Sequence, residues 1–135
     1  MKIVIIDGQG GKMGAALTKQ LIESFPDSEV ISIGTNSMAT EAMLKAGAKM
    51  AATGENPVVV CTADADFILG PMGILTANSL LGEITPKMAM AVSESHAKKV
   101  LIPVTKCSVS VVGVREMSLN YYIREALQIV KSING

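Results

Sequence analysis

KIVIIDGQGGKMG, residues 2–14, is the segment of this chain that implies the most specific geometry. Ile3 to Ile6 are consecutive aliphatic residues, most of them β-branched, which is typical of a strand buried on both faces of a parallel sheet. Glycines follow, and a helix is predicted to begin directly after them. A buried strand that enters a helix through a glycine-rich turn predicts an α/β fold with a phosphate-binding loop.

Each glycine of this turn has a predicted role. Gly8 permits the tight turn off the strand, and Gly14 lets helix and strand pack closely. Gly10 and Gly11 leave room for a pyrophosphate against bare backbone, which the helix dipole and the unpaired N–H groups attract without any side-chain charge. The predicted cofactor contacts of the loop are Gly8, Gln9, Gly10, Gly11, Lys12, Met13 and Gly14.

The spacing of the glycines departs from the usual dinucleotide fingerprint, whose third glycine would stand where this chain has Met13. The related spacing G-x-x-G-x-x-G fits, and as GQGGKMG it resembles the dinucleotide loop of dihydrodipicolinate reductases, which also carries a Met before the last glycine. The remaining residues have no room for that enzyme's separate substrate domain. The resemblance therefore implies a binding geometry and leaves the reaction open, and a purely architectural glycine turn remains the alternative.

The composition bounds the class of protein. A chain of 135 residues suits one domain, residues 1–135, and is too short for two. Lys plus Arg equals Asp plus Glu, 12 each, so no charge imbalance indicates a nucleic acid or a membrane as partner. The apolar runs are too short to span a bilayer and no cleavable signal is recognised, so a cytoplasmic protein is expected.

The cysteines and methionines indicate little chemistry. Cys61 and Cys107 stand apart, without a C-x-x-C motif or clustered histidines, so no metal site is predicted and both are expected to be reduced thiols. A nucleophilic role for Cys107, beside Lys106, is disfavoured because no histidine is near. Nine Met residues suggest either a flexible core or an apolar surface for a partner subunit, and a homo-oligomer is expected.

The pattern of apolar residues, caps and breakers predicts alternating strands and helices. This alternation indicates a single-domain Rossmann-like α/β fold, a three-layer sandwich with a mostly parallel sheet. Only six residues connect the last two predicted strands, so the last one is predicted to be antiparallel. The predicted strands are 3–6, 29–33, 49–52, 67–69, 99–102 and 109–114, and the predicted helices are 12–24, 38–46, 57–63, 74–81, 86–95 and the segment after Ser118. The predicted N-caps are Ser37, Thr85 and Ser118, and Gly47 is the predicted C-terminal cap of the helix over 38–46.

Polar residues follow the carboxyl ends of these strands and are expected to share one edge of the sheet. In open α/β sheets, ligands bind outside that edge, where the strand order reverses. Surface loops are polar by default, which is the simpler explanation. The polar segments are 7–9, 35–37, 53–56, 70–73 and 105–107, and their predicted cofactor contacts beyond the glycine loop are Thr35, Asn36, Ser37, Gly70 and Pro71.

An NAD-binding loop normally needs a carboxylate about 20 residues after the glycines to hold the ribose hydroxyls. Asp27 and Glu29 have that spacing, but they precede the second predicted strand and so lie at its wrong end. The correct end, 35–37, carries neither an acid nor a base. Thr35 and Asn36 remain as hydrogen-bonding groups, so the cofactor stays unknown, with NAD(P) or another nucleotide open.

Catalytic candidates are few. Asp7, at the mouth of the glycine loop, fits a base equally well as a group that accepts hydrogen bonds from neighbouring backbone. Glu55 fits a ligand contact, but helix capping is favoured, and His96 is expected to complement a helix dipole. For Asn78, Ser79 and Glu83 the sequence leaves open whether they line the crevice or satisfy helix ends.

The whole chain resembles a family of short bacterial proteins of unknown function that is described only as Rossmann-like. The resemblance rests on IDGQGG, GTNSMAT, AGA followed by ATGEN, and ILGPMGI leading to NSLLGEITP. It implies the fold and no activity. The prediction is a nucleotide- or dinucleotide-binding protein with the ligand phosphates at residues 8–14; the alternative is a non-catalytic, oligomerising interaction module.

Overall fold

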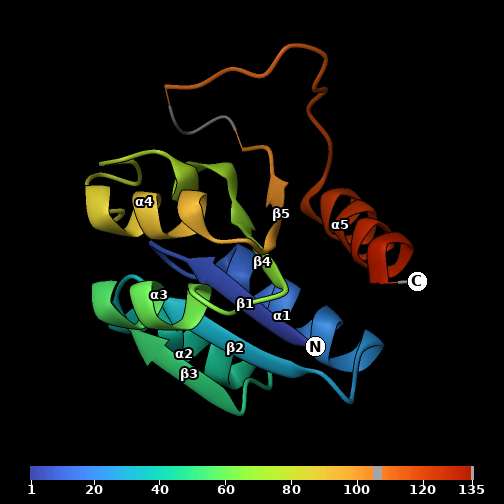
Figure 1. The fold of residues 1–135 in the computed structure, drawn as a ribbon. Helices are drawn as coiled ribbons and strands as arrows, with labels where there is room; N and C mark the ends of the chain where they lie inside the picture. The colour runs from blue at the N-terminus through green and yellow to red at the C-terminus, as the bar shows by residue number, and fades with distance from the viewer. Residues whose placement is uncertain (105–107, 135) are drawn as a thin grey trace.

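The sheet places the glycine-loop strand at its centre. In the computed structural model, which describes residues 1–104 and 108–134, five strands pair in the order β3-β2-β1-β4-β5, and every pairing is parallel. Parallel strands need crossover connections, and each connection between successive strands contains an α-helix (Figure 1). The strands are β1 (Lys2–Asp7), β2 (Glu29–Gly34), β3 (Met50–Thr53), β4 (Phe67–Pro71) and β5 (Lys98–Ile102).

Helices cover both faces of this sheet, which confirms the single-domain Rossmann-like sandwich. One face packs against α1, α2 and α5, and the other against α3 and α4. The helices are α1 (Lys12–Ser24), α2 (Ser37–Lys45), α3 (Glu55–Thr62), α4 (Pro86–Glu94) and α5 (Leu119–Asn134), with a short 3-10 helix η1 (Met72–Leu75) after β4.

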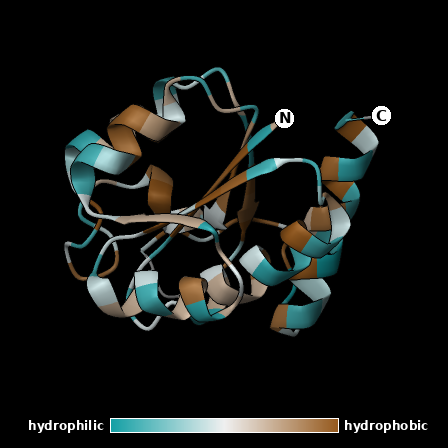
Figure 2. Ribbon diagram, turned by 90° about the horizontal axis from the view of Figure 1, so that it is seen from below, coloured by the Kyte–Doolittle hydropathy of each residue, from teal (hydrophilic) through white to brown (hydrophobic). Residues whose placement is uncertain are grey.

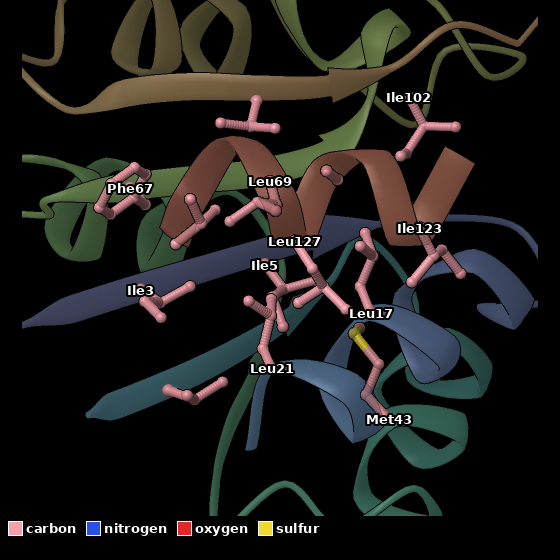
Figure 3. Packing of buried hydrophobic residues seen from close by; sticks show 14 of the residues in the cluster. Ile3, Ile5, Leu17, Leu21, Met43, Phe67, Leu69, Ile102, Ile123 and Leu127 are labelled. Carbon is pink, nitrogen blue, oxygen red and sulfur yellow. The ribbon is translucent and has the colours of Figure 1, made fainter. Parts of the chain in front are cut away.

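Alternate residues of β1 enter two separate cores. Ile3 and Ile5 point to the α1 side, while Val4 and Ile6 point to the α3 side, and all four are buried. A central strand covered on both faces must be apolar at every position, which is the pattern read from the sequence. Figure 3 shows the first core, to which Ile3 and Ile5 of β1 and Leu127 of α5 belong. Figure 2 shows the helices alternating between hydrophilic and hydrophobic residues, as expected for helices with one face on the sheet.

Local capping fixes where the helices begin and end. The prediction of α1 at 12–24 is confirmed, as are the Thr85 cap of α4 and the Ser118 contact at the start of α5. At α2 the cap is Asn36, not Ser37, because the Asn36 side chain accepts a hydrogen bond from the Ala39 N–H. Gly47, with φ +118°, ends α2 as predicted.

The predicted antiparallel last strand is wrong. Residues 109–114 form no strand, and β5 is an edge strand whose described pairing is with β4. Pro103 follows β5 directly, and Gly113 has φ +88°, so the segment turns instead of extending. Its valines favour a strand by propensity, but β-propensity depends on a pleated partner that this part of the fold does not provide.

The predicted helix over 74–81 is also wrong. Helical backbone ends at Leu75, and Asn78, Leu80 and Leu81 adopt positive φ angles of 66°, 55° and 57°. Left-handed residues cannot continue a right-handed helix, so the segment forms successive turns before α4. These turns bring Glu83 to the site described below.

In the described part of the chain, no helix is both long enough and apolar enough to cross a membrane.

Candidate functional site

A cavity of about 330 Å³ opens where the strand order reverses, between β1 and β4. The glycine loop after β1 forms one side, and Pro71 at the end of β4 forms another. This is the position at which open α/β sheets bind ligands. The lining residues are Asp7, Gly8, Gln9, Gly10, Gly11, Lys12, Met13, Pro71, Leu80, Val104 and Leu119.

The loop glycines serve close packing as well as the cavity. A Cβ on Gly14 would lie 2.7 Å from both the Asp7 Cβ and the Met43 Sδ, so α1 can approach β1 only without a side chain there. A Cβ on Gly11 would lie 2.6 Å from the Ala39 Cα, and Gly11 has φ +74°. The missing side chain of Gly11 therefore makes room for α2, whereas Gly10 has open space around its Cβ position.

Asp7 holds the loop onto the strand. Its buried carboxylate accepts the Gly8 N–H at 2.8 Å through Oδ1 and the Gly14 N–H at 2.6 Å through Oδ2. Burial raises the pKa of Asp7, the two backbone hydrogen bonds act in the opposite direction, and the nearby Glu83 charge raises it further. Because both carboxylate oxygens accept backbone N–H groups, Asp7 acts as a capping residue.

Three loop N–H groups remain open. Among the described residues, the backbone N–H groups of Gly10, Lys12 and Met13 have no hydrogen-bond partner, whereas Gly11 donates to the Gly8 carbonyl at 2.9 Å. All three residues line the cavity. Open donors at a helix amino terminus form an anion-binding arrangement, and Lys12 adds the one basic side chain among the described lining residues.

A carboxylate stands at the end of β2, although the sequence places none there. Glu83 reaches this point from the turns before α4, and its Oε1 accepts the Gln9 N–H at 2.9 Å. The same oxygen accepts the Thr35 hydroxyl at 2.6 Å and the Asn36 amide at 2.7 Å. Burial alone would raise the pKa of Glu83, but these three hydrogen bonds outweigh it and hold the pKa below its ordinary value.

The turns that carry Glu83 are tied to their surroundings. The Asn78 N–H donates to the Ile84 carbonyl at 2.7 Å, and the Ser79 hydroxyl donates to the Gly73 carbonyl at 2.5 Å. Leu80 enters the cavity wall, and its Cδ1 lies 3.0 Å from the Cβ position of Gly8. A sequence motif could not reveal this, because Glu83 joins residues that lie 47 and 48 positions away.

The predicted contacts outside the glycine loop lie in different surroundings. Thr35 and Asn36 contact Glu83 beside the glycine loop, while Ser37 is exposed on the first turn of α2. Gly70 is buried, and its Cβ position lies 2.3 Å from the Ile6 carbonyl oxygen, so it allows β4 to approach β1.

Other candidates lie away from the cavity. Glu55 begins α3 beyond the edge strand β3, where it complements the helix dipole, and no cap hydrogen bond is formed there. His96 is exposed and precedes β5, at the amino end of the strand. The predicted contributions of 105–107, including Cys107, lie outside the described residues.

Comparisons with known proteins give a family and a fold. A family model described as "Domain of unknown function (DUF3842)" matches residues 2–134. No curated protein matches the chain. The crystal structure of a dodecameric FMN-dependent UbiX-like decarboxylase from Escherichia coli O157:H7 superposes with a TM-score of 0.51 and 19% identity, over 99% of this chain and 77% of that one. At this identity the likeness shows the fold alone.

Proposed function

Since the chain belongs to the family described as domain of unknown function DUF3842, which brings no activity with it, we propose a function from the geometry of the cavity. The protein binds a nucleotide or dinucleotide, with phosphate oxygens at the glycine loop. The observation that carries this proposal is the set of open N–H groups of Gly10, Lys12 and Met13 on a cavity at the strand-order reversal.

The remaining walls of the cavity suit the apolar part of such a ligand. Pro71, Leu80, Val104 and Leu119 present carbon surface on the sides that the loop leaves free. A small set of oriented polar groups beside apolar walls is the usual make-up of a cofactor site. The decarboxylase that shares the fold is FMN-dependent, and FMN carries a phosphate, which lends support to a phosphate-bearing ligand for this chain.

A thermal-shift panel with NADH, NADPH, ATP, FAD and FMN tests the proposal. A ligand at about 100 times its Kd adds roughly 2.7 kcal/mol to the free energy of unfolding, which moves the midpoint by several degrees. If no compound of the panel moves the midpoint, the proposal is wrong.

A matched pair of variants at Gly10 tests the role of the loop. Because the Cβ position of Gly10 has no neighbour within 4 Å, both Gly10→Asp and Gly10→Asn are expected to fold. The two side chains have nearly the same shape and differ in charge. The aspartate should weaken binding of the active compound at least about tenfold more than the asparagine, because it places a negative charge beside the phosphates. Equal binding by the two variants would remove the loop from the site.

A second candidate function, a homo-oligomeric interaction module, is favoured by one apolar segment. The described residues 109–114 expose four valines, and Val112 is 100% exposed. Next to this segment, a second cavity of about 650 Å³ follows the free edge of β5 and the flank of α5. Exposed apolar surface of this kind marks contacts between proteins, and the decarboxylase that shares the fold is dodecameric.

Light scattering after gel filtration tests the oligomer. The wild-type chain should elute as an assembly, and Val112→Asp should lower its mass, since a charge would be buried in the contact. Val60→Asp is the matched control, since Val60 is an exposed valine of α3 on the other face of the sheet, and it should leave the mass unchanged. A wild-type monomer at all concentrations would contradict this candidate.

A further inference from the structure

We propose that Glu83 selects the sugar of the bound nucleotide. Its second carboxylate oxygen accepts hydrogen bonds from the ribose hydroxyls, so the site takes nucleotides with a free 2′-hydroxyl and rejects those with a 2′-phosphate. This inference rests on the proposed nucleotide-binding function and assigns the specificity of the same site.

The position of Glu83 supports this role. Dinucleotide-binding folds hold the ribose with an acid at the carboxyl end of the strand next to the glycine-loop strand. Here that strand is β2, which pairs with β1 along its whole length and ends at Gly34. Glu83 contacts Thr35 and Asn36, the next two residues. The acid therefore occupies the expected place in space, although it comes from a distant part of the sequence.

The orientation of the carboxylate leaves one oxygen for a ligand. Oε1 takes all three donors, from Gln9, Thr35 and Asn36, which fixes the side chain. Among the described residues, Oε2 has no hydrogen-bond partner, and Glu83 is partly exposed to solvent. A carboxylate held through one oxygen presents the lone pairs of the other in a fixed direction, as recognition of a hydroxyl pair requires.

Glu83 also borders the proposed phosphate site. Its Oε1 lies 3.0 Å from the Cβ position of Gly8, and it bonds the N–H of Gln9. Both of these residues line the cavity, as does Leu80 on the same turns. A nucleotide whose phosphate lies at the start of α1 would therefore bring its sugar to this border.

The charges around Glu83 explain the rejection of a 2′-phosphate. Its hydrogen-bond donors are a backbone N–H, a hydroxyl and an amide, none of which neutralises a charge. The hydrogen bonds keep the pKa of Glu83 low, so the side chain is ionised at neutral pH. A phosphate placed against this carboxylate would meet like-charge repulsion with no arginine or lysine from 35–37 to relieve it.

Isothermal titration of the full chain with NADH and NADPH tests the selection, because the two compounds differ only in the 2′-phosphate. Wild type should bind NADH at least about tenfold more tightly. Glu83→Gln should reduce this ratio to less than about threefold. Glu29→Gln is the matched control, since it removes the same charge from the opposite end of β2, and its ratio should equal that of wild type.

A second titration needs no variant and so does not depend on how Glu83→Gln folds. Wild type should bind ADP about tenfold more tightly than 2′-deoxy-ADP, because a hydrogen bond to a charged group is lost with the hydroxyl. Equal affinities in this pair, or an NADH preference that survives Glu83→Gln, would overturn the role of Glu83 and leave nucleotide binding intact. If FMN binds and none of the other compounds does, the role of Glu83 is likewise overturned while nucleotide binding stands. If neither these compounds nor FMN bind, the proposed function itself fails.

Discussion

The Asp7 carboxylate accepts the Gly14 N–H at 2.6 Å, so a strand residue caps the helix that follows the glycine loop. The N-cap residue of α1 is Gly11, which has no side chain to do this. Gly14 is the third residue of the helix, and its N–H is the one that a cap ordinarily satisfies. With this donor occupied, the open donors that remain are those of Lys12, Met13 and Gly10.

Asp7→Ala should therefore destabilise the fold. It removes the acceptor of two N–H groups, those of Gly8 and Gly14, and leaves them in buried surroundings. We expect the free energy of unfolding to fall by about 2–3 kcal/mol in urea titrations. Asp7→Asn keeps one acceptor oxygen and should cost about 1 kcal/mol. A loss below about 0.5 kcal/mol for Asp7→Ala would contradict the capping role.

The raised pKa of Asp7 predicts a pH dependence of stability. Burial favours the protonated form in the folded state, so the folded protein binds more protons than the unfolded chain between the two pKa values. The contribution of Asp7 is complete below the unfolded pKa of about 3.9 and is lost as the pH rises through the folded value. Unfolding of wild type and Asp7→Asn at several pH values should show wild type losing stability relative to the variant as the pH rises. A constant difference would show that Asp7 has no perturbed pKa.

Glu83 should show the opposite sign. Its pKa is lowered in the folded state, so its contribution is present above the unfolded pKa of about 4.3 and is lost as the pH falls through the folded value. Glu83→Gln should therefore cost about 1 kcal/mol at pH 7 and progressively less in acid. Urea titrations from pH 3 to pH 7 measure this, and a cost that grows toward pH 3 would contradict the hydrogen-bond network at Oε1.

The sequence predicts local structure well where one local signal dominates. The bounds of α1 follow from the glycine turn before it and from apolar residues at helical spacing within it. Both signals lie among neighbouring residues of the sequence. The β-branched residues within 57–63 favour a strand by propensity, yet they lie in the helix α3. The reason is that β3 and β4 are parallel, so the chain between them must cross over the sheet. Here topology gives the better prediction than propensity.

Long-range placement accounts for the errors. Val109 to Val114 have strand propensity, but whether they pair with β5 depends on packing that no local pattern encodes. The acid at the end of β2 could not be predicted for the same reason. Glu83 reaches it through left-handed turns at Asn78, Leu80 and Leu81, which an apolar stretch does not predict. The glycine loop could therefore be located from sequence, whereas its carboxylate partner could not.

A comparison of two adjacent glycines separates the packing role of the loop from its binding role. Gly11 has φ +74°, and a Cβ there would lie 2.6 Å from the Ala39 Cα and 2.9 Å from its carbonyl oxygen. Gly11→Ala should lower the free energy of unfolding by at least about 2 kcal/mol, because it combines left-handed strain with a backbone clash against α2. Gly10→Ala meets nothing within 4 Å and should stay within about 0.5 kcal/mol of wild type in the same thermal and urea unfolding experiments. Equal stability of the two variants would mean that α1 and α2 do not approach each other through Gly11.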